Sequence, residues 1–533
     1  MMQTFQDLMQ RFQSGAGLNP VREFVHASLA GYPDHIHELQ QAVDSLITQV
    51  DTLHVFLNEF GEIPEFLNRE NIFVTQSKDF GNLGECGKYY WTDDLEGFHF
   101  ICSDRLVYPP DYVQTMLEKI EQYQRKSVIG AGGYQLQLPF ASFAGSTHYL
   151  TETGIIHADT PVKLISDLAL AYHHTTLHVS RHFFYQPELS CLWLSVIGLE
   201  QQVPFICSCH EAGWITATGS RTDIRPPADD LADYRSFLVK SYFTSPDPGY
   251  LHGKSMNINS CFDRIYVLNL DRRPDRWEKI QQTAENHHLD LTRFTAVDGS
   301  LEPVKSEWES YSKSELQKLP DGIAPLENFT DKFLKYHHYI ARVHFMESKL
   351  GRKAIQSPGA WGYALSYIQI LKDAILHDYQ RIIILDDDII LYKSFNNAFE
   401  KHFSSLPEDW KLIMLGAMQH QWEPWITPYS DLFYHCHGSS VASHAIGMTR
   451  KVFLPLLFYA EKLDLPIDEG AISHIQNVYS RQSFVFLPNL AIQDMRESDI
   501  SSSDMKQQDA DRWMKLFRWN PDDYDIECME NNQ

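Results

Sequence analysis

The chain has 533 residues, more than a single hydrophobic core usually organises, so its length predicts roughly two to four domains. Hydrophobic residues make up 43% and aromatic residues 13% of the chain, which is typical of a globular protein. The net charge of −25 argues against a broad nucleic-acid-binding surface, because such a surface needs a basic face.

The cysteines and the amino terminus indicate a cytoplasmic protein. The eight cysteines lack the spacing of a disulfide framework or a zinc site, and Cys207 and Cys209 are separated by one residue. The first residues lack the basic start and apolar centre of a signal peptide. We find no apolar run of about 18 residues, so we expect no transmembrane segment. Peripheral contact with the inner face of a membrane stays open, as does a homo-oligomer.

Residues 1–20 are predicted to form a tail or short helix, and residues 21–219 a first α/β unit. Apolar, β-branched runs alternate with segments of helical spacing, which is typical of a largely parallel sheet. Strands are expected within 22–33, 52–60, 70–77 and 97–104, and helices within 35–50 and 108–124.

A stretch rich in Pro, Gly, Asp and Ser at 220–260 is predicted to be a linker that contains a short helix at 231–243. A second α/β unit then follows at 261–533. Within it we expect strands at 265–270, 381–385 and 410–417, helices at 275–288 and 361–379, a short strand and turn at 291–300, and an insertion at 302–356. The predicted fold class is therefore two α/β units in tandem, each with a mostly parallel sheet.

Three consecutive aspartates, Asp386, Asp387 and Asp388, follow the apolar run "RIIIL". Ligands of open α/β sheets bind at the carboxyl ends of strands, and carboxylates two residues apart on extended backbone point to the same side. Such a pair can hold a hard divalent cation, and the cation can hold a diphosphate. The alternative is a solvated acidic turn, although apolar runs flank the triplet on both sides.

Two catalytic chemistries fit a strand that ends in Asp-x-Asp. A phosphatase with an aspartate nucleophile places the motif on the first strand of its domain, with a hydroxylated residue soon after. Here the motif lies far into the unit and is followed by Ile389, Ile390 and Leu391. This arrangement favours a glycosyltransferase that uses a nucleotide sugar. A non-catalytic sugar-binding protein is a further alternative.

Three segments, at 265–277, 359–375 and 382–391, together resemble glycosyltransferase family 25, and the likeness extends over about 262–500. Gly359, Gly362 and Ser366 match the family's pattern Gly-x-x-Gly-Cys-x-x-Ser-His, whereas Tyr363 and Tyr367 replace its Cys and His. Asp386 replaces the Glu of the family's Glu-Asp-Asp and keeps the charge.

The resemblance implies a GT-A fold and an inverting transfer of a hexose, such as galactose, from a UDP-sugar. It also implies Mn²⁺ (or Mg²⁺) as cofactor and a glycan or lipid-linked saccharide acceptor, in surface polysaccharide or lipooligosaccharide synthesis. The residues that it implies are Asp386 and Asp388 for the metal, and Val267, Leu268, Asn269, Arg273, Arg276, Ser366 and Asp387 for the substrate. Arginines after a strand suit a diphosphate, but they are also common at a solvated helix start.

An inverting transfer needs a base, and Asp468 lies where the family has Pro-x-Asp. The alternative role of Asp468 is a helix cap. Ser443 and His444 resemble acceptor-side residues, and His444 could equally be a core histidine. Gln493 and the segment 498–499 resemble the family's ending, where they would close the site.

The first unit resembles a GT-A domain of glycosyltransferase family 2, but two acidic positions are lost. Cys102, Ser103 and Asp104 stand where related sequences have three aspartates, and Ser190 and Cys191 stand near another expected aspartate. A single carboxylate supplies few of the oxygen ligands that a metal site needs. We therefore expect a unit without catalysis that serves as a scaffold, acceptor-binding or dimerisation module. The alternative is a bifunctional protein in which both units are active.

Overall fold

The computed structural model describes residues 23–218, 232–244, 256–312, 345–420, 428–436, 440–494 and 514–526, with a few single positions between them. The chain divides into two compact units. Unit 1 comprises Met1–Gln137 and Ser146–Pro227, and unit 2 comprises Leu138–Gly145 and Ala228–Gln533. The predicted amino-terminal tail, the middle of the 302–356 insertion, and Ser498 and Asp499 lie outside the described residues.

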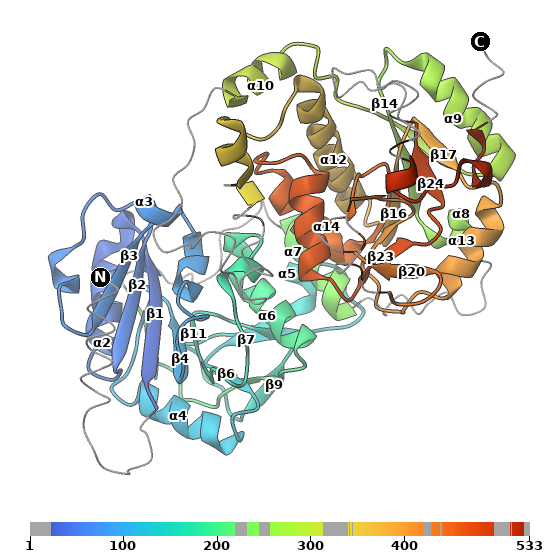
Figure 1. Cartoon of the computed structure of the whole chain (residues 1–533). Helices are drawn as coiled ribbons and strands as arrows, with labels where there is room; N and C mark the ends of the chain where they lie inside the picture. The colour runs from blue at the N-terminus through green and yellow to red at the C-terminus, as the bar shows by residue number, and fades with distance from the viewer. Residues whose placement is uncertain are drawn as a thin grey trace. The chain divides into compact units, whose positions relative to one another are not determined.

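Unit 1 is built on an eight-stranded sheet of order β3-β2-β1-β4-β11-β6-β12-β9 (Figure 1). β11 runs antiparallel to β4 and β6, β9 runs antiparallel to β12, and the other neighbours are parallel. The strands of this sheet are β1 (Val25–Gly31), β2 (Thr52–Leu57), β3 (Ile72–Gln76), β4 (Phe98–Cys102), β6 (Val128–Gly130), β9 (Thr160–Val162), β11 (Ala169–His173) and β12 (Phe205–Cys207). Shorter sheets contain β5 (Leu106–Val107), β7 (Gly133–Leu136), β8 (Thr147–Leu150), β10 (Leu164–Ile165) and β13 (Thr216–Ala217).

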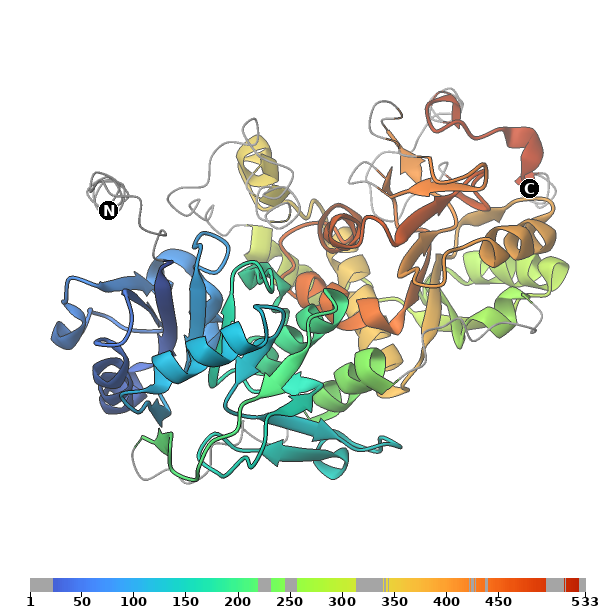
Figure 2. The same ribbon diagram turned by 90° about the horizontal axis from the view of Figure 1, so that it is seen from below.

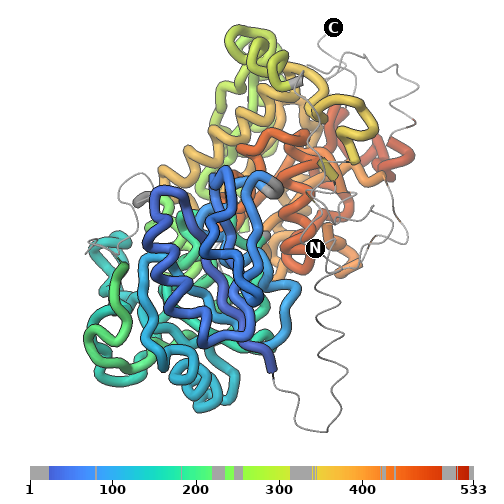
Figure 3. Tube along the Cα trace, turned by 90° about the vertical axis from the view of Figure 1, so that its left-hand side faces the viewer, coloured from blue at the N-terminus to red at the C-terminus, as the bar shows by residue number. Residues whose placement is uncertain are grey.

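One face of this sheet packs on the helices α2 (Ile36–Leu46) and α4 (Tyr112–Gln122), which Figure 2 shows beside the blue and cyan strands. Alternate strand residues point to the same side, so Val25, Ala27 and Leu29 of β1 all enter one apolar core with these helices. Figure 3 traces the unit from blue to green. The helix α6 (Ser190–Glu200) connects β11 to β12.

The opposite face of the sheet carries a row of buried histidines on neighbouring strands. The ring centroid of His26 lies 5.8 Å from that of His54 and 5.9 Å from that of His99. All three side chains are buried, and Trp91 lies against His54 at 5.0 Å. Burial, followed by the repulsion of neighbouring imidazoles, lowers the pKa of both His54 and His99 to about 3. These rings are therefore neutral in the folded protein.

This histidine row predicts that unit 1 loses stability in mild acid. Below the unfolded histidine pKa of about 6.5, the histidines of the unfolded chain bind protons, whereas the buried rings of the folded protein stay neutral. The free energy of unfolding therefore decreases by about 1.4 kcal/mol for each histidine and each pH unit as the pH is lowered. Urea unfolding of the full chain at pH 7, 6 and 5 should show this fall for unit 1. The His54→Phe variant should have a shallower pH dependence, and an equal slope in both proteins would contradict the assignment.

Unit 2 is built on a seven-stranded sheet of order β15-β14-β16-β22-β18-β23-β20. Its strands are β14 (Arg264–Asn269), β15 (Leu291–Thr295), β16 (Arg381–Asp386), β18 (Leu412–Met414), β20 (Phe433–His435), β22 (Ala445–Thr449) and β23 (Ser483–Phe486). Two short two-stranded sheets add β17 (Ile389–Leu391) with β24 (Ala491–Gln493), and β19 (Met418–Gln419) with β21 (Ser440–Val441).

Helices cover both faces of this second sheet (Figure 1). On one face α9 (Pro274–His287) and α13 (Phe395–Ser404) share a core with the alternate residues Ile383 and Leu385 of β16. α12 (Pro358–Leu376) and α14 (Arg450–Ala460) lie on the other face and contact each other. Coverage on both sides explains the unbroken apolar sequence of β16. Further helices of the unit include α8 (Ile258–Cys261), α10 (Val304–Ser312) and α15 (Ser473–Val478).

The helix predicted inside the linker is present as α7 (Ala232–Val239), followed by a π-helical turn at Lys240–Thr244. It packs into unit 2 instead of bridging freely between units. The ring of Phe237 lies 6.0 Å from that of Phe453, and Arg450 donates to the hydroxyl of Ser241 at 2.9 Å. The apolar side chains of this stretch thus extend the fold of unit 2.

The two sheets share one plan. If β3 at the edge of unit 1 is set aside, the order β2-β1-β4-β11-β6-β12-β9 corresponds strand by strand to β15-β14-β16-β22-β18-β23-β20. Chain order and the direction of each neighbour also agree. The predicted fold class, two mostly parallel α/β sheets in tandem, is confirmed. Among the described residues, no helix combines the length and apolar composition needed to cross a membrane.

Candidate functional site

A cavity of about 590 Å³ opens in unit 2 at the carboxyl ends of the parallel strands β14, β15 and β16. This edge is where α/β sheets bind ligands, because the connections after neighbouring parallel strands meet there. The cavity is lined by residues that follow these three strands and by the first turns of α12. Its charged lining residues are Arg272, Arg276, Asp298, Arg352, Asp386, Asp387 and Asp388.

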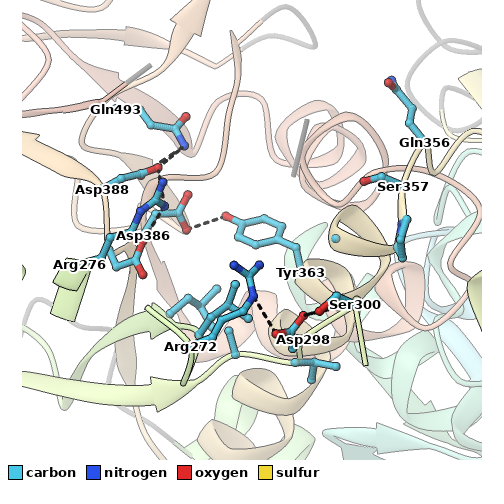
Figure 4. Close-up of a pocket in the computed structure, with 18 of the residues that line it drawn as sticks. Arg272, Arg276, Asp298, Ser300, Gln356, Ser357, Tyr363, Asp386, Asp388 and Gln493 are labelled. Carbon is cyan, nitrogen blue, oxygen red and sulfur yellow. Dashed lines mark hydrogen bonds and ion pairs between the residues drawn. The ribbon is translucent and has the colours of Figure 1, made fainter. Parts of the chain in front are cut away.

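The three aspartates occupy the turn between β16 and β17 (Figure 4). Nη1 of Arg276, from α9, lies 3.1 Å from Oδ1 of Asp387 and 3.3 Å from Oδ2 of Asp388. Nε2 of Gln493 lies 3.3 and 3.4 Å from the two carboxylate oxygens of Asp388. The hydroxyl of Tyr363 donates to Oδ1 of Asp386 at 2.9 Å. The amide of Asn269 donates to Oδ2 of Asp387 at 2.7 Å, so one guanidinium and three neutral donors face the three carboxylates.

The electrostatics of this cluster favour an additional cation. Burial and the neighbouring charge of Asp388 raise the pKa of Asp386 well above its usual range. Burial also raises the pKa of Asp388 to about 7, against the opposing effect of Arg276. The side chains of Asp387 and Asp388 are 10% and 11% exposed, so they remain reachable from the cavity.

Asp386 and Asp388 fit a hard divalent cation as a pair of carboxylates. The part of the chain that the structure describes contains no group of three or more His, Cys, Asp or Glu side chains placed to hold a metal ion. A cation at these two side chains would therefore take its remaining ligands from substrate or water oxygens, as Mg²⁺ commonly does at phosphate sites. Because like charges this close oppose one another, a cation would also relieve the repulsion within the triplet.

The arginines after β14 divide into two groups. Arg276 and Arg272 line the cavity, and Arg272 Nε donates to Asp298 at 2.9 Å. Arg273, which the resemblance assigned to the substrate, is not among the lining residues and pairs with Asp275 at 2.8 Å. Arg352, which the sequence analysis did not single out, lines the cavity from the other side. The structure therefore brings a different arginine set to the cavity from the one predicted.

The three residues of β14 that were predicted to bind substrate do not all face the cavity. Leu268 lines the cavity, whereas Val267 is fully buried within the sheet. Asn269 is buried, and its amide nitrogen lies 2.7 Å from Oδ2 of Asp387 and 3.0 Å from the carbonyl oxygen of Arg273. Asn269 thus orients an aspartate and closes the turn after the strand.

The wall opposite the aspartates is formed by residues 296–300, which follow β15, packed on the start of α12. The sequence analysis missed this loop, although it follows the strand next to β14. Ser366 is fully buried and does not line the cavity; its hydroxyl accepts from the N–H of Val297 at 2.8 Å and donates to the Gly362 carbonyl. A side chain on Gly362 would lie 2.3 Å from the Val297 carbonyl oxygen. Gly362 and Ser366 therefore hold the loop in place.

Asp468 is linked to the aspartate cluster through a short polar network, although it does not line the cavity. Tyr363 lies 3.0 Å from Oγ of Ser443, and the N–H of Ala442 donates to Oδ2 of Asp468 at 3.2 Å. Ala442 has a φ of 74°, a left-handed conformation that is rare for a residue other than glycine. Burial and the nearby charge of Glu469 raise the pKa of Asp468. Asp468 opens a π-helical turn, Asp468–Ile472, of which Ile467 is the cap residue.

His444 lies in the core. Its Nε2 donates to the Ala491 carbonyl at 3.1 Å, and burial lowers its pKa to about 4. The side chain is 1% exposed and does not line the cavity. This environment corresponds to the alternative of a core histidine.

Residues 262–439 match a family model described as glycosyltransferase family 25 (LPS biosynthesis protein), which is less than half of the chain. A glycosyltransferase 25 family member of Drosophila pseudoobscura pseudoobscura is 24% identical over 211 residues, covering 39% of this chain and 29% of that protein. Human procollagen galactosyltransferase 2 is 23% identical over 163 residues, with coverages of 30% and 21%. Procollagen galactosyltransferase 1 of Danio rerio is 26% identical over 165 residues, with coverages of 30% and 22%.

The chain thus spans less than a third of the length of these relatives. The family match lies within unit 2 and includes β14, α12, β16 and the three aspartates. Unit 2 therefore contains a segment that is similar to glycosyltransferases, and every lining residue of the cavity except Gln493 lies in that segment.

The close contact at Gly362 predicts that Gly362→Ala disturbs the cavity. The added methyl group would force the backbone at 297–299 to move, at a cost of about 1–3 kcal/mol of unfolding free energy. Urea unfolding should show the lower stability. Gly61→Ala is the control, because nothing lies within 4 Å of the added atom. Unchanged stability in Gly362→Ala would contradict the packing described.

Proposed function

We propose that unit 2 transfers a hexose from a UDP-sugar to a hydroxyl group of a saccharide acceptor, with the aid of Mn²⁺ or Mg²⁺. The observation that carries this proposal is the enclosed pair Asp386 and Asp388 beside a cavity of about 590 Å³ that three arginines also line. A nucleoside diphosphate brings negative charge that the arginines can pair with and oxygens that a cation can share. The glycosyltransferase match over 262–439 supports the same chemistry.

Six residues that line the cavity have a role in this proposal. Asp386 and Asp388 would hold the cation, and the cation would supply positive charge against the charge that develops on the leaving diphosphate. Arg272, Arg276 and Arg352 provide fixed positive charge around the phosphates. Tyr363 donates to Asp386 and keeps one of its oxygens oriented.

Asp468 is the proposed base that takes the proton from the acceptor hydroxyl. Burial and the charge of Glu469 raise its pKa, which makes the carboxylate a stronger base than an ordinary aspartate. Side-chain hydrogen bonds join Asp386 to Tyr363 and Tyr363 to Ser443. Ser443 follows Ala442 in the chain, and the backbone N–H of Ala442 donates to Asp468, so the segment 442–443 connects the proposed base to Asp386. Attack from the side opposite the diphosphate would invert the anomeric configuration.

The names of two similar proteins support the identity of the transferred sugar, and the description of the family supports the type of acceptor. Proteins similar to this segment are called procollagen galactosyltransferases, which supports galactose as the transferred hexose. The family description mentions LPS biosynthesis, which supports a glycan or lipid-linked acceptor in surface polysaccharide or lipooligosaccharide assembly. In that setting the protein would act in the cytoplasm, where nucleotide sugars are the donors.

We further propose that unit 1 is a GT-A-like domain that has lost transferase chemistry. The shared strand plan of the two sheets supports the common fold. The connection after β4 keeps Asp104 in place of an acidic triplet, and Asp104 is buried with its pKa raised to about 7 by burial and by Glu85. A single buried carboxylate offers a cation fewer ligands than the aspartates at the end of β16.

The first experiment measures UDP release from a panel of UDP-sugars with Mn²⁺, with and without EDTA. We expect one sugar to turn over, EDTA to stop it, and Asp388→Asn to lower kcat/KM by at least about a hundredfold, because the cation loses a ligand.

Asp290→Asn is the matched control, because it makes the same change at an exposed position of unit 2. Asp104→Asn should also leave the rate unchanged. Release of phosphate from simple phosphoesters would favour the phosphatase, and binding without turnover would favour a non-catalytic sugar-binding protein. Either result contradicts the proposal.

The role of Asp468 predicts a separate effect of Asp468→Asn. Loss of a general base should lower kcat by about 10²–10⁴-fold while the affinity for UDP stays within about twofold. Asp290→Asn, the same change at an exposed position of unit 2, is the control. A parallel loss of UDP affinity in Asp468→Asn would assign the residue to folding or donor binding instead.

A further inference from the structure

Unit 1 contains its own cavity, of about 210 Å³, at the sheet edge that corresponds to the cavity of unit 2. Tyr32 follows β1, Arg105 follows β4, and Asp167 precedes β11; all three line the cavity. Pro187 and Ser190, at the start of α6, complete the wall. The same sheet plan therefore presents a second enclosed space, with different side chains.

A buried lysine next to this cavity supplies a permanent cation. Lys88 is fully buried, and its Nζ lies 2.9 Å from the Asp167 carbonyl oxygen, 3.1 Å from Asp167 Oδ2 and 3.3 Å from Glu85 Oε2. The hydroxyl of Tyr89 donates to the same carboxylate oxygen of Asp167 at 3.1 Å. Burying an ammonium is costly unless its partners are well placed, as they are here. Arg105 also lies 3.5 Å from Glu85, so the carboxylates of Asp167 and Glu85 both have cationic partners within the protein.

The rest of the cavity combines aromatic rings with hydroxyl groups. Tyr134 and Tyr149 stack on each other with ring centroids 4.5 Å apart, and both line the cavity. Burial and the charges of Glu85, Glu59 and Glu188 raise the pKa of Tyr32 to about 12, so its hydroxyl is a donor at neutral pH. Ser166 and Ser190 add buried hydroxyl groups.

Charge and size limit the ligand class. Glu85, Asp167 and Glu188 line the cavity with Arg105 as the only lining cation among the described residues, so a phosphate group would meet more carboxylates than cations. The volume is below the roughly 300–1,000 Å³ typical of pockets for drug-sized ligands. An uncharged ring with one apolar face and several hydroxyl groups fits both limits. Its C–H face would lie on an aromatic side chain, and its hydroxyls would donate to carboxylates and accept from Tyr32 and Ser190.

We propose that unit 1 binds a single uncharged saccharide ring in this cavity, with Lys88 in the place where a metal-dependent site would need a cation. The proposal does not depend on the transferase activity of unit 2. The ligand is either a free sugar or the end of a longer glycan, because both present the same ring.

The test is ligand-observed NMR on the full chain with methyl glycosides of glucose, galactose, mannose and N-acetylglucosamine, in the presence of EDTA. Disaccharides ending in the preferred ring form a second arm that separates a free sugar from a glycan end. We expect one glycoside to bind, with equal affinity in the Asp388→Asn variant, whose change lies in unit 2. Glu188→Gln and Tyr32→Phe should each raise its Kd roughly tenfold, because the first replaces a charged acceptor with a neutral amide and the second removes a hydroxyl group.

Glu62→Gln is the control for Glu188→Gln, because both residues are exposed glutamates of unit 1 and Glu62 does not line the cavity. Glu188 is at the rim, so its substitution should not impair folding, and the far-UV spectrum checks this. If no glycoside binds, or if binding is unaffected by Glu188→Gln and Tyr32→Phe, the proposal is wrong. Metal-dependent binding of UDP that Glu188→Gln alters would equally overturn it.

Discussion

The site of unit 2 depends on how three carboxylates are accommodated at the end of a buried strand. β16 is covered on both faces, and its apolar residues lead directly into Asp386. Charge in such a position is costly unless it is paired. Arg276 reaches Asp387 and Asp388 from α9, while Tyr363 and Gln493 bring neutral donors from α12 and β24. Elements far apart in sequence are therefore joined at this edge by the need to satisfy these oxygens.

The two sheets have the same strand order, but the two units provide different partners for their carboxylates. In unit 2 the carboxylates exceed the positive charge around them, which leaves a place for an exchangeable cation and a charged ligand. In unit 1 two acidic side chains at the equivalent edge, Asp167 and Glu85, are paired with the buried Lys88, which is part of the protein itself. A shared strand order thus does not fix the chemistry, because function depends on the side chains placed on the fold.

Several residues act on the cavity of unit 2 without lining it. Ser366 and Gly362 hold the loop after β15, and Asn269 orients Asp387. A similar division separates Arg276, which meets the aspartates, from Arg273, which pairs locally with Asp275. Residues that match a family pattern therefore include positioning residues as well as residues that face the ligand.

The sequence by itself determined the strand before the aspartates, a long helix predicted at 361–379, the tandem α/β fold class and the likeness to glycosyltransferase family 25. In the structure that helix is Pro358–Leu376. These predictions follow from local periodicity and short motifs, which the chain carries without reference to distant partners. Only the tertiary structure decided that residues 296–300 and Arg352 line the cavity, and that His444 belongs to the core. It also decided that Lys88 is buried between Asp167 and Glu85, and that both sheets share one strand order. These features depend on contacts between segments that are distant in the chain, and a single sequence does not specify such contacts by its local pattern.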